Sequence, residues 1–339
     1  MTKVLLTGSS GYIGKHILLQ LLNQGYEVSA SVRNLSKSQE VRDAVTPHVT
    51  DPISLEKLLT FVELDLEKDA GWDAALLGVE VLIHTASPFP IASPKDENEL
   101  IRPAVQGTLR ALKAAHLAGV KRVILTSSNA AVYGCDLPEG KSAYDETLWT
   151  DIDHPIGRVA YTKSKTLAER AAWDFIHSEA PEIELTTINP VLVLGAPLDK
   201  NFGSSISVIE RILKGKDPML PDLRFPIVDV RDVARMHVEA IKNADSIGER
   251  ILASSETLSF IEIAKYLKSI YPKSNTKTMQ APTFIIKILA IFDGEIKAVL
   301  PLLGKPMMTS NEKAKKIFGV SFISAKESVK NSAEFLLEQ

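Results

Sequence analysis

The sequence predicts an α/β fold in which helices cover both faces of a doubly wound parallel sheet. Apolar runs typical of buried strands alternate with amphipathic helical patterns through the first half of the chain. A glycine-rich turn joins the first strand to the first helix, and small or polar residues follow the strands. Past residue 195 the alternation breaks, so we expect a smaller C-terminal domain. The chain has 339 residues, 45% of them hydrophobic, which is enough for a sizeable core.

The glycine-rich turn predicts a phosphate site. Residues 3–7 read as a strand and residues 15–22 as a helix, and Gly8-Ser-Ser-Gly11-Tyr-Ile-Gly14 lies between them. In this context the first glycine permits a tight turn, the second lets a pyrophosphate approach the backbone, and the third lets the helix pack on the strand. The helix N-terminus then faces the phosphates. An ordinary glycine-rich turn is the alternative, but the strand and helix around it favour a Rossmann-type dinucleotide site.

The residue after the second strand predicts the kind of dinucleotide. Residues 26–32 read as that strand, Arg33 follows it, and Lys37 comes about one turn later. An acidic residue at this point binds the ribose hydroxyls of NAD, whereas a basic residue accommodates the 2′-phosphate of NADP. A solvated surface pair is the alternative. Because the chain has two cations and no carboxylate here, we favour NADP.

The third and fourth strands are expected at residues 61–64 and 79–84. Asp65 follows the third strand and could accept a hydrogen bond from an adenine amino group or cap the next helix. The sequence alone leaves both open. His84 stands inside an apolar strand, so we expect a satisfied core histidine rather than a catalyst.

Several strand ends are predicted to meet at one edge of the sheet. A long helix is expected at residues 98–118 and a fifth strand at residues 120–126. Ligands of parallel sheets gather at the carboxyl ends of the strands. The residues that we expect there are Gly8, Arg33, Asp65, Thr85, Ala86, Ser87, Ser127 and Ser128.

Ser128, Tyr161 and Lys165 are the candidate catalytic residues. Tyr161 and Lys165 lie four positions apart at the start of a helix expected at about 160–178, so they share one face. An ammonium group beside a tyrosine favours the phenolate and lowers the phenol pKa. The tyrosine can then exchange a proton during catalysis, and the serine hydroxyl can hold a substrate oxygen. Such a pair also occurs by chance on surfaces, but here it follows a phosphate loop and a strand that ends in Ser-Ser.

These motifs together resemble the extended short-chain dehydrogenases/reductases, and within them the dihydroflavonol 4-reductase group. That group includes cinnamoyl-CoA reductases, yeast methylglyoxal/isovaleraldehyde reductase and bacterial aldehyde or ketone reductases. The resemblance covers nearly the whole chain. The motifs that carry it are Thr7-Gly8-x-x-Gly11-x-x-Gly14, Asp65-Leu66, His84-Thr-Ala-Ser-Pro88, Asp96-Glu-Asn-Glu-Leu-Ile-Arg-Pro103, Leu125-Thr-Ser-Ser128, Tyr161-x-x-x-Lys165, Thr166-Leu-Ala-Glu-Arg-Ala-Ala-Trp173, Asn189-Pro190 and Ile227-Val-Asp-Val-Arg-Asp-Val233.

The resemblance implies that Ser128, Tyr161 and Lys165 form the catalytic triad and that Lys165 also holds the nicotinamide ribose. Asn129-Ala-Ala-Val-Tyr133 lacks the polar residue that plant flavonoid reductases carry after the serine, which disfavours a flavonoid substrate. No catalytic role is assigned to Gln106. The full cofactor-binding set that we expect is Thr7, Gly8, Gly11, Tyr12, Ile13, Gly14, Arg33, Lys37, Asp65, Leu66, Thr85, Ala86, Ser87, Tyr161, Lys165, Pro190 and Val191.

The second half of the chain is expected to complete the sheet and add a substrate domain. The expected strands are residues 183–189, 224–229, which would return to the sheet, and 250–253; the expected helices are 204–214, 232–243, 260–270, 283–289, 311–317 and 324–338. Arg231 and Asp232 are a candidate ion pair. We therefore expect an NADP-binding domain at residues 1–194, with a return segment at about 224–254, and a substrate domain at residues 195–223 and 255–339.

The substrate would lie between the two domains. Its candidate wall residues are apolar, and each could equally belong to the core: Phe89, Ala130, Val132, Leu192, Phe202, Ile206 and Ile209. Without a charge cluster for a CoA or nucleotide-sugar ligand, we expect a modest apolar carbonyl compound.

Composition argues against other classes of protein. The net charge is −3, which gives no reason to expect nucleic acid or an anionic membrane as a partner. The single cysteine, Cys135, excludes an intramolecular disulfide and a multi-cysteine metal site, so we expect no metal and a structural role for this residue. No signal peptide or apolar run of about 18 residues is seen. We expect a soluble cytoplasmic protein, monomeric or homodimeric.

The leading functional hypothesis is an NADPH-dependent reductase that converts a small aldehyde or ketone to an alcohol. A nucleotide-sugar epimerase or dehydratase on the same scaffold is the alternative, although Arg33 argues against the NAD that such enzymes hold. A non-catalytic NADP(H)-sensing protein is a third, although such proteins typically lose the pair that Tyr161 and Lys165 form here.

Overall fold

A seven-stranded parallel sheet forms the centre of the structure, a computed structural model that describes residues 1–53, 55–88, 96–292 and 294–339. Its strand order is β3-β2-β1-β4-β5-β6-β9. The strands are β1 (Lys3–Thr7), β2 (Glu27–Val32), β3 (Leu59–Glu63), β4 (Val81–His84), β5 (Arg122–Thr126), β6 (Glu184–Pro190) and β9 (Arg250–Ala253). The order reverses between β1 and β4, which places a ligand crevice at the carboxyl ends of these strands.

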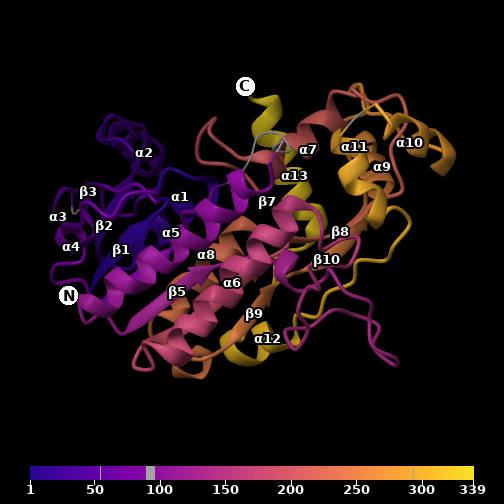
Figure 1. The fold of residues 1–339 in the computed structure, drawn as a ribbon. Helices are drawn as coiled ribbons and strands as arrows, with labels where there is room; N and C mark the ends of the chain where they lie inside the picture. The colour runs from indigo at the N-terminus through magenta and orange to yellow at the C-terminus, as the bar shows by residue number, and fades with distance from the viewer. Residues whose placement is uncertain (54, 89–95, 293) are drawn as a thin grey trace.

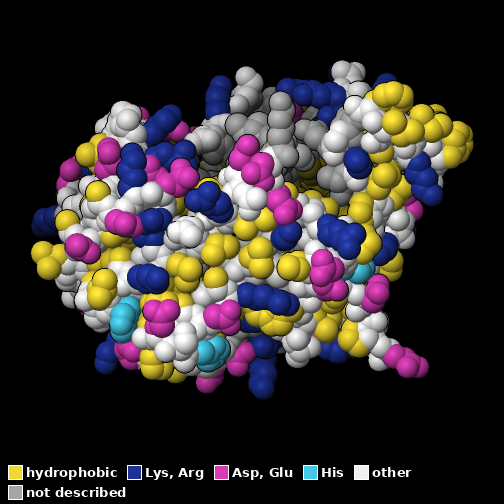
Figure 2. Space-filling model, in the orientation of Figure 1, with side chains coloured by type: hydrophobic (Ala, Val, Ile, Leu, Met, Phe, Trp, Pro, Cys, Tyr) yellow, Lys and Arg dark blue, Asp and Glu magenta, His cyan; other side chains and the backbone are white. Residues whose placement is uncertain are grey.

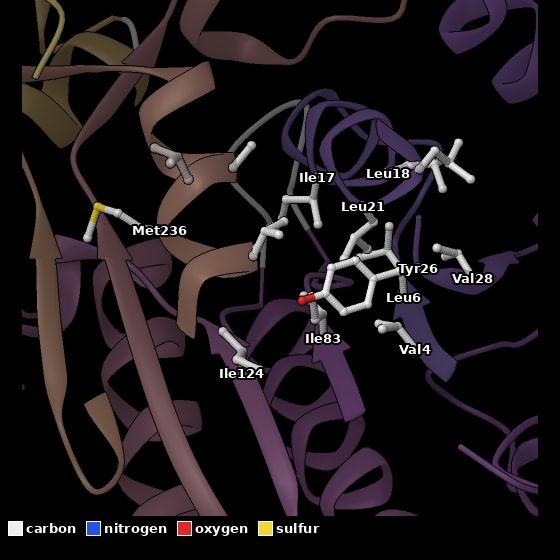
Figure 3. Close-up of a cluster of buried hydrophobic side chains, with 14 of the residues drawn as sticks. Val4, Leu6, Ile17, Leu18, Leu21, Tyr26, Val28, Ile83, Ile124 and Met236 are labelled. Atoms are coloured by element: carbon white, nitrogen blue, oxygen red, sulfur yellow. The ribbon is translucent and has the colours of Figure 1, made fainter. Parts of the chain in front are cut away.

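Helices cover both faces of this sheet, which confirms the predicted doubly wound fold (Figure 1). On one face Ile17, Leu18 and Leu21 of α1 join Met236 of α8 in a core over β1, β2, β4 and β5 (Figure 3). On the other face α4, α5 and α6 enclose a second core that contains Trp72. The helices of this part are α1 (Tyr12–Asn23), α2 (Ser38–Val45), α3 (Leu55–Leu58), α4 (Trp72–Ala75), α5 (Asn98–Leu117), α6 (Ala160–Ser178), α8 (Val230–Ala240) and α12 (Glu312–Phe318).

A smaller unit is built on a second sheet with the order β10-β8-β7. Its strands are β7 (Leu192–Leu194), β8 (Arg224–Asp229) and β10 (Glu256–Ser259). Ile206, Ile263 and Val329 contribute to its core, in which helices pack on this sheet. Its helices are α7 (Ser204–Leu213), α9 (Phe260–Ile270), α10 (Thr283–Leu289), α11 (Gly294–Val299) and α13 (Ala325–Leu337).

The position of residues 224–229 corrects one prediction. We expected this segment to return to the main sheet, but β8 pairs with β7 in parallel and with β10 in antiparallel orientation. Beyond β6, the main sheet continues with β9. The predicted return segment is therefore divided: residues 250–253 join the main sheet and residues 224–229 form the centre of the small one.

The predicted ion pair between Arg231 and Asp232 is also wrong. Arg231 instead binds Asp229 with two hydrogen bonds, from Nε to Oδ1 at 2.8 Å and from Nη2 to Oδ2 at 2.9 Å. Asp229 precedes α8 and also accepts a hydrogen bond from the Arg231 backbone N–H. Adjacent residues in a helix point to different faces, and Asp232 pairs with Arg235 one turn later.

Among the helices described here, none is both long and apolar enough to cross a membrane.

Candidate active site

The glycine-rich turn packs closely on the end of β4. Gly8 has a φ of +71°, and a Cβ there would lie 2.7 Å from Thr85 Oγ1. A Cβ on Gly14 would lie 2.1 Å from the Gly8 carbonyl oxygen. Gly11 instead meets only the Gly8 oxygen, at 3.3 Å, and starts α1 without a side-chain cap. Two glycines are thus required by packing, and the third leaves the helix N-terminus open to an anion.

A cavity of about 460 Å³ opens beside this turn at the carboxyl ends of β1, β2 and β4. Predicted cofactor residues make up most of its wall, namely Thr7, Gly8, Gly11, Arg33, Lys37, Leu66, Thr85, Ala86 and Ser87. The sequence analysis missed Ser10, Ser31, Asn34, Leu64, Trp72 and Asn201, which also line it. The convergence of strand ends therefore produces a real cavity rather than separate surface sites.

Arg33 and Lys37 supply positive charge at one end of this cavity. Both side chains are exposed, and Lys37 Nζ lies 2.7 Å from Glu40 Oε2. That hydrogen bond raises the pKa of Lys37. Two exposed cations on one cavity wall match the chemistry of a phosphate monoester.

Other predicted cofactor residues lie near the cavity without lining it. Tyr12 donates from Oη to the Gly195 carbonyl at 3.0 Å, while Ile13 packs against the core under α1. Asp65 accepts a hydrogen bond from the Glu67 N–H at 3.0 Å, so its carboxylate is used in a local turn, and it does not cap the next helix, because α4 begins after Gly71. Pro190 ends β6 in a buried position, and Val191, also buried, follows it.

The segment after β7 lies against the glycine-rich turn and α1. Lys15 is almost fully buried and forms an ion pair with Asp199. Asn201 Nδ2 donates to the Ser10 carbonyl at 3.4 Å and to Glu40 Oε1 at 3.3 Å. Residues 195–201 thus connect the cofactor cavity to the small unit. Sequence spacing gives no signal for these contacts, because the partners are 161 to 191 residues apart.

Ser128, Tyr161 and Lys165 are brought together as predicted. Ser128 lies two residues after the end of β5 and accepts a hydrogen bond at Oγ from the Ala130 N–H at 3.1 Å. Tyr161 hydrogen-bonds with the Ser128 side chain, and Lys165 Nζ lies 5.8 Å from the centroid of the Tyr161 ring. Lys165 also donates to Ser87 Oγ at 2.7 Å, which links this group to the cofactor cavity.

The electrostatics of this group differ from the simple expectation. Burial raises the pKa of Tyr161, and the hydrogen bond with Ser128 opposes this only in part. Burial also lowers the pKa of Lys165 to about 8. We expected the lysine to lower the phenol pKa, but desolvation of both groups is the larger effect.

A buried polar network supports the backbone around Ser128. Glu169, two turns after Tyr161 on α6, pairs with Arg250 Nε at 2.6 Å and accepts hydrogen bonds from Ser127 and Asn189. Asn189 Nδ2 also donates to the Ser128 carbonyl at 3.1 Å. The sequence analysis used Glu169 and Asn189 only as signs of resemblance and did not predict the network. A signal existed, since Glu169 continues the face of Tyr161 and Lys165 at four-residue spacing.

His84 is a core histidine, but it is not fully satisfied. Its Nδ1 lies 2.8 Å from Thr7 Oγ1, whereas its buried Nε2 has no hydrogen-bond partner among the described residues. Burial and the nearby Lys165 charge lower its pKa to about 3, so it is neutral. The expectation of a satisfied side chain holds for only one ring nitrogen.

The predicted substrate wall is divided between a cavity and the cores. Leu192 lines a second, apolar cavity of about 380 Å³ together with Leu223, Phe225 and Phe260. Ala130, Val132, Ile206 and Ile209 expose almost no surface and are core residues in this structure, and Phe202 packs on Phe335. Phe89 lies outside the described residues. Cys135 is partly buried, and burial raises its pKa, which fits a structural role.

No group of three or more residues suited to hold a metal ion occurs within the described ranges.

A glycine-rich dinucleotide cleft beside a Ser-Tyr-Lys group defines the class of protein, an extended short-chain dehydrogenase/reductase. The chain belongs to the NAD dependent epimerase/dehydratase family, which matches residues 4–253.

Several proteins similar to this chain are reductases. The chain is 32% identical to a cinnamoyl-CoA reductase of Medicago truncatula over 99% of its own length and 96% of that protein. It is 33% identical to an anthocyanidin reductase of Vitis vinifera, covering 80% of this chain and 81% of that protein. The solved structure of yeast methylglyoxal/isovaleraldehyde reductase Gre2 complexed with NADPH is similar with a TM-score of 0.80, at 26% identity over 99% of this chain and 98% of that chain. The protein is accordingly an oxidoreductase.

Proposed function

We propose that this protein is an NADPH-dependent reductase that converts the carbonyl group of a small aldehyde or ketone to an alcohol. The observation that carries the proposal is the contact of Lys165 with Ser87. This contact supports the proposal because Lys165 belongs to the Ser128–Tyr161–Lys165 group and Ser87 lines the same cavity as Arg33 and Lys37. A carbonyl compound and a reducing cofactor can then meet at one place.

The cavity residues fit NADP(H). Gly8 and Gly11 leave room for a pyrophosphate against the uncapped start of α1. Arg33 and Lys37 would bind the 2′-phosphate, and Thr85, Ala86 and Ser87 would line the path toward the nicotinamide. The relative Gre2 has been solved with NADPH, which supports the same choice here.

The bound cofactor supplies a hydride to the carbonyl carbon. Ser128 holds the carbonyl oxygen, and Tyr161 gives that oxygen its proton, so the product is an alcohol and Tyr161 becomes a phenolate. The raised pKa of Tyr161 keeps it protonated at neutral pH, which is the form that reduction needs. Lys165, still mostly protonated at pH 7, stabilises the phenolate until solvent returns the proton.

The test is cofactor oxidation by the purified protein with NADPH and NADH. The panel should contain aliphatic and aromatic aldehydes, ketoesters and a dihydroflavonol. We expect turnover with NADPH preferred, and loss of at least about a hundredfold in kcat for Tyr161→Phe. Near-full turnover by Tyr161→Phe would contradict the mechanism. If the wild type shows no turnover with either cofactor and retains NAD through purification, the epimerase or dehydratase alternative is favoured.

A further inference from the structure

Helix α10 and the turn that follows it expose an unusually apolar surface. Phe284 and Ile288 are 64% and 53% exposed, and Ile291 and Phe292 after the helix are 75% and 84% exposed. Figure 2 shows hydrophobic side chains gathered over this part of the molecule, where Figure 1 places α10. We call these residues, together with Leu289, the α10 patch.

The helix under the α10 patch is apolar on its inner side as well. Ile286 and Ala290 are 7% and 5% exposed and hold the helix on the small unit. Phe284 and Ile288 are four positions apart on α10 and share one face of it, and Ile291 and Phe292 follow the helix. An exposed apolar surface of this kind indicates a contact with an apolar partner.

Exposed lysines surround the α10 patch in the sequence. Residues 271–305 contain five lysines and only two acidic residues, whereas the whole chain has a net charge of −3. No ion pair is formed by any of these lysines in the described part of the chain, and all are exposed: Lys273, Lys277, Lys287, Lys297 and Lys305. A second copy of this chain would bring like charges together, whereas an anionic lipid surface complements them.

The α10 patch also borders the apolar cavity of the small unit. Leu289 is 45% exposed and lines that cavity, as do Ile285 and Ile286. Leu289 therefore belongs both to the α10 patch and to the wall of a space that Leu192 and Phe225 also line. A carbonyl compound dissolved in lipid would meet this wall first.

We propose that the α10 patch seats the protein on an anionic lipid surface, without crossing it, and that the enzyme takes a lipophilic carbonyl substrate from there. The net charge of the whole chain gave no reason to expect a membrane partner, because the excess of lysine at residues 271–305 is local. The substrate part of this proposal rests on the proposed reductase function, and the lipid contact does not.

The test is sedimentation of the full-length protein with vesicles of phosphatidylcholine alone and of phosphatidylcholine with phosphatidylglycerol. The wild type should bind the anionic vesicles, and binding should fall at raised salt. F284E/F292E should abolish binding, and K287E/K297E should weaken it by at least about tenfold. L77E/L117E is the matched control, because Leu77 and Leu117 are 77% and 81% exposed on the dinucleotide-binding part, and it should bind like the wild type.

Three results would overturn the proposal. They are no binding to anionic vesicles, equal loss of binding in the L77E/L117E control, and a wild-type dimer that F284E/F292E converts to monomers, since a second copy would then cover the α10 patch. Turnover of a water-soluble aldehyde separates the two proposals: F284E/F292E should keep it. If the wild type binds vesicles but has no turnover, the reductase proposal fails and the lipid contact stands.

Discussion

Lys165 donates a hydrogen bond to Ser87, from Nζ to Oγ at 2.7 Å, and so joins α6 to the end of β4. The lysine is 9% exposed, and its burial lowers its pKa to about 8. The fold thus holds a cation where water does not solvate it fully. This placement has a cost in stability that can be measured.

Lys165→Met should stabilise the protein and remove its activity. The pKa of Lys165 falls from about 10.5 in the unfolded chain to about 8 in the folded one, which corresponds to about 3 kcal/mol at neutral pH. The cost is fully present below about pH 8 and disappears as pH rises past about 10.5. Urea unfolding at pH 7 and pH 11 checks this. Lys163→Met, which removes a lysine that pairs with Glu97 near the surface, is the control and should change stability by less than about 1 kcal/mol.

Acid should destabilise the protein through its buried histidines. Burial lowers the pKa of His84 to about 3 and of His16 and His237 to about 4, so each binds a proton more readily when unfolded. Above about pH 6.5 these histidines are neutral in both states and do not lower the unfolding free energy. As pH falls from 6.5 toward 4, the unfolded chain binds the protons more readily and the unfolding free energy falls. His84→Leu should make the fall in unfolding free energy between pH 6.5 and 4 shallower than in the wild type. An unchanged slope would contradict the assignment of His84 as a neutral buried group.

Glu169→Gln should destabilise the fold by about 3–5 kcal/mol, because it leaves the Arg250 guanidinium buried without its carboxylate. It should also lower kcat, since Glu169 binds Ser127 and Asn189 beside Ser128. Urea unfolding and turnover on the same preparation check both effects. The control is Glu249→Gln, whose partner Lys313 lies at the surface, and a loss there as large as for Glu169 would contradict the argument from burial.

Arg33→Ala should raise the KM for NADPH by at least about tenfold and leave the KM for NADH nearly unchanged. A hydrogen bond between charged groups contributes about 1.5–3 kcal/mol, and only NADPH has the 2′-phosphate that Arg33 would bind. Initial rates with both cofactors provide the measurement. Lys57→Ala removes one exposed positive charge away from the cavity and should change neither value. Equal effects on both cofactors would place Arg33 outside the phosphate site.

The main sheet and the centre of the site were predictable because their signals are local. Residues 3–14 contain strand, turn and helix start in one run, and the parallel sheet then requires the strand ends near Arg33, Thr85 and Ser128 to meet. Tyr161 and Lys165 share a helix face by spacing alone.

What was missed depends on contacts between distant residues. Pro226 and Val228 read as a strand, but nothing in their sequence says that β7 rather than β6 is their neighbour. Asn201 reaches the cofactor cavity only because the chain folds back over α1. The raised pKa of Tyr161 likewise depends on burial, which the four-residue spacing to Lys165 does not report.

The segment at residues 195–201 limits how substrate preference can change. The segment begins directly after β7 of the small sheet. At its other end Asn201 lines the cofactor cavity, and Asp199 pairs with Lys15. A graft that exchanges the substrate-facing part of this protein for that of a relative should therefore begin after Asn201. A graft that begins at Leu192 and carries no carboxylate at position 199 would leave Lys15 buried without a counter-charge beside the glycine-rich turn, so a change intended for the substrate should also weaken cofactor binding.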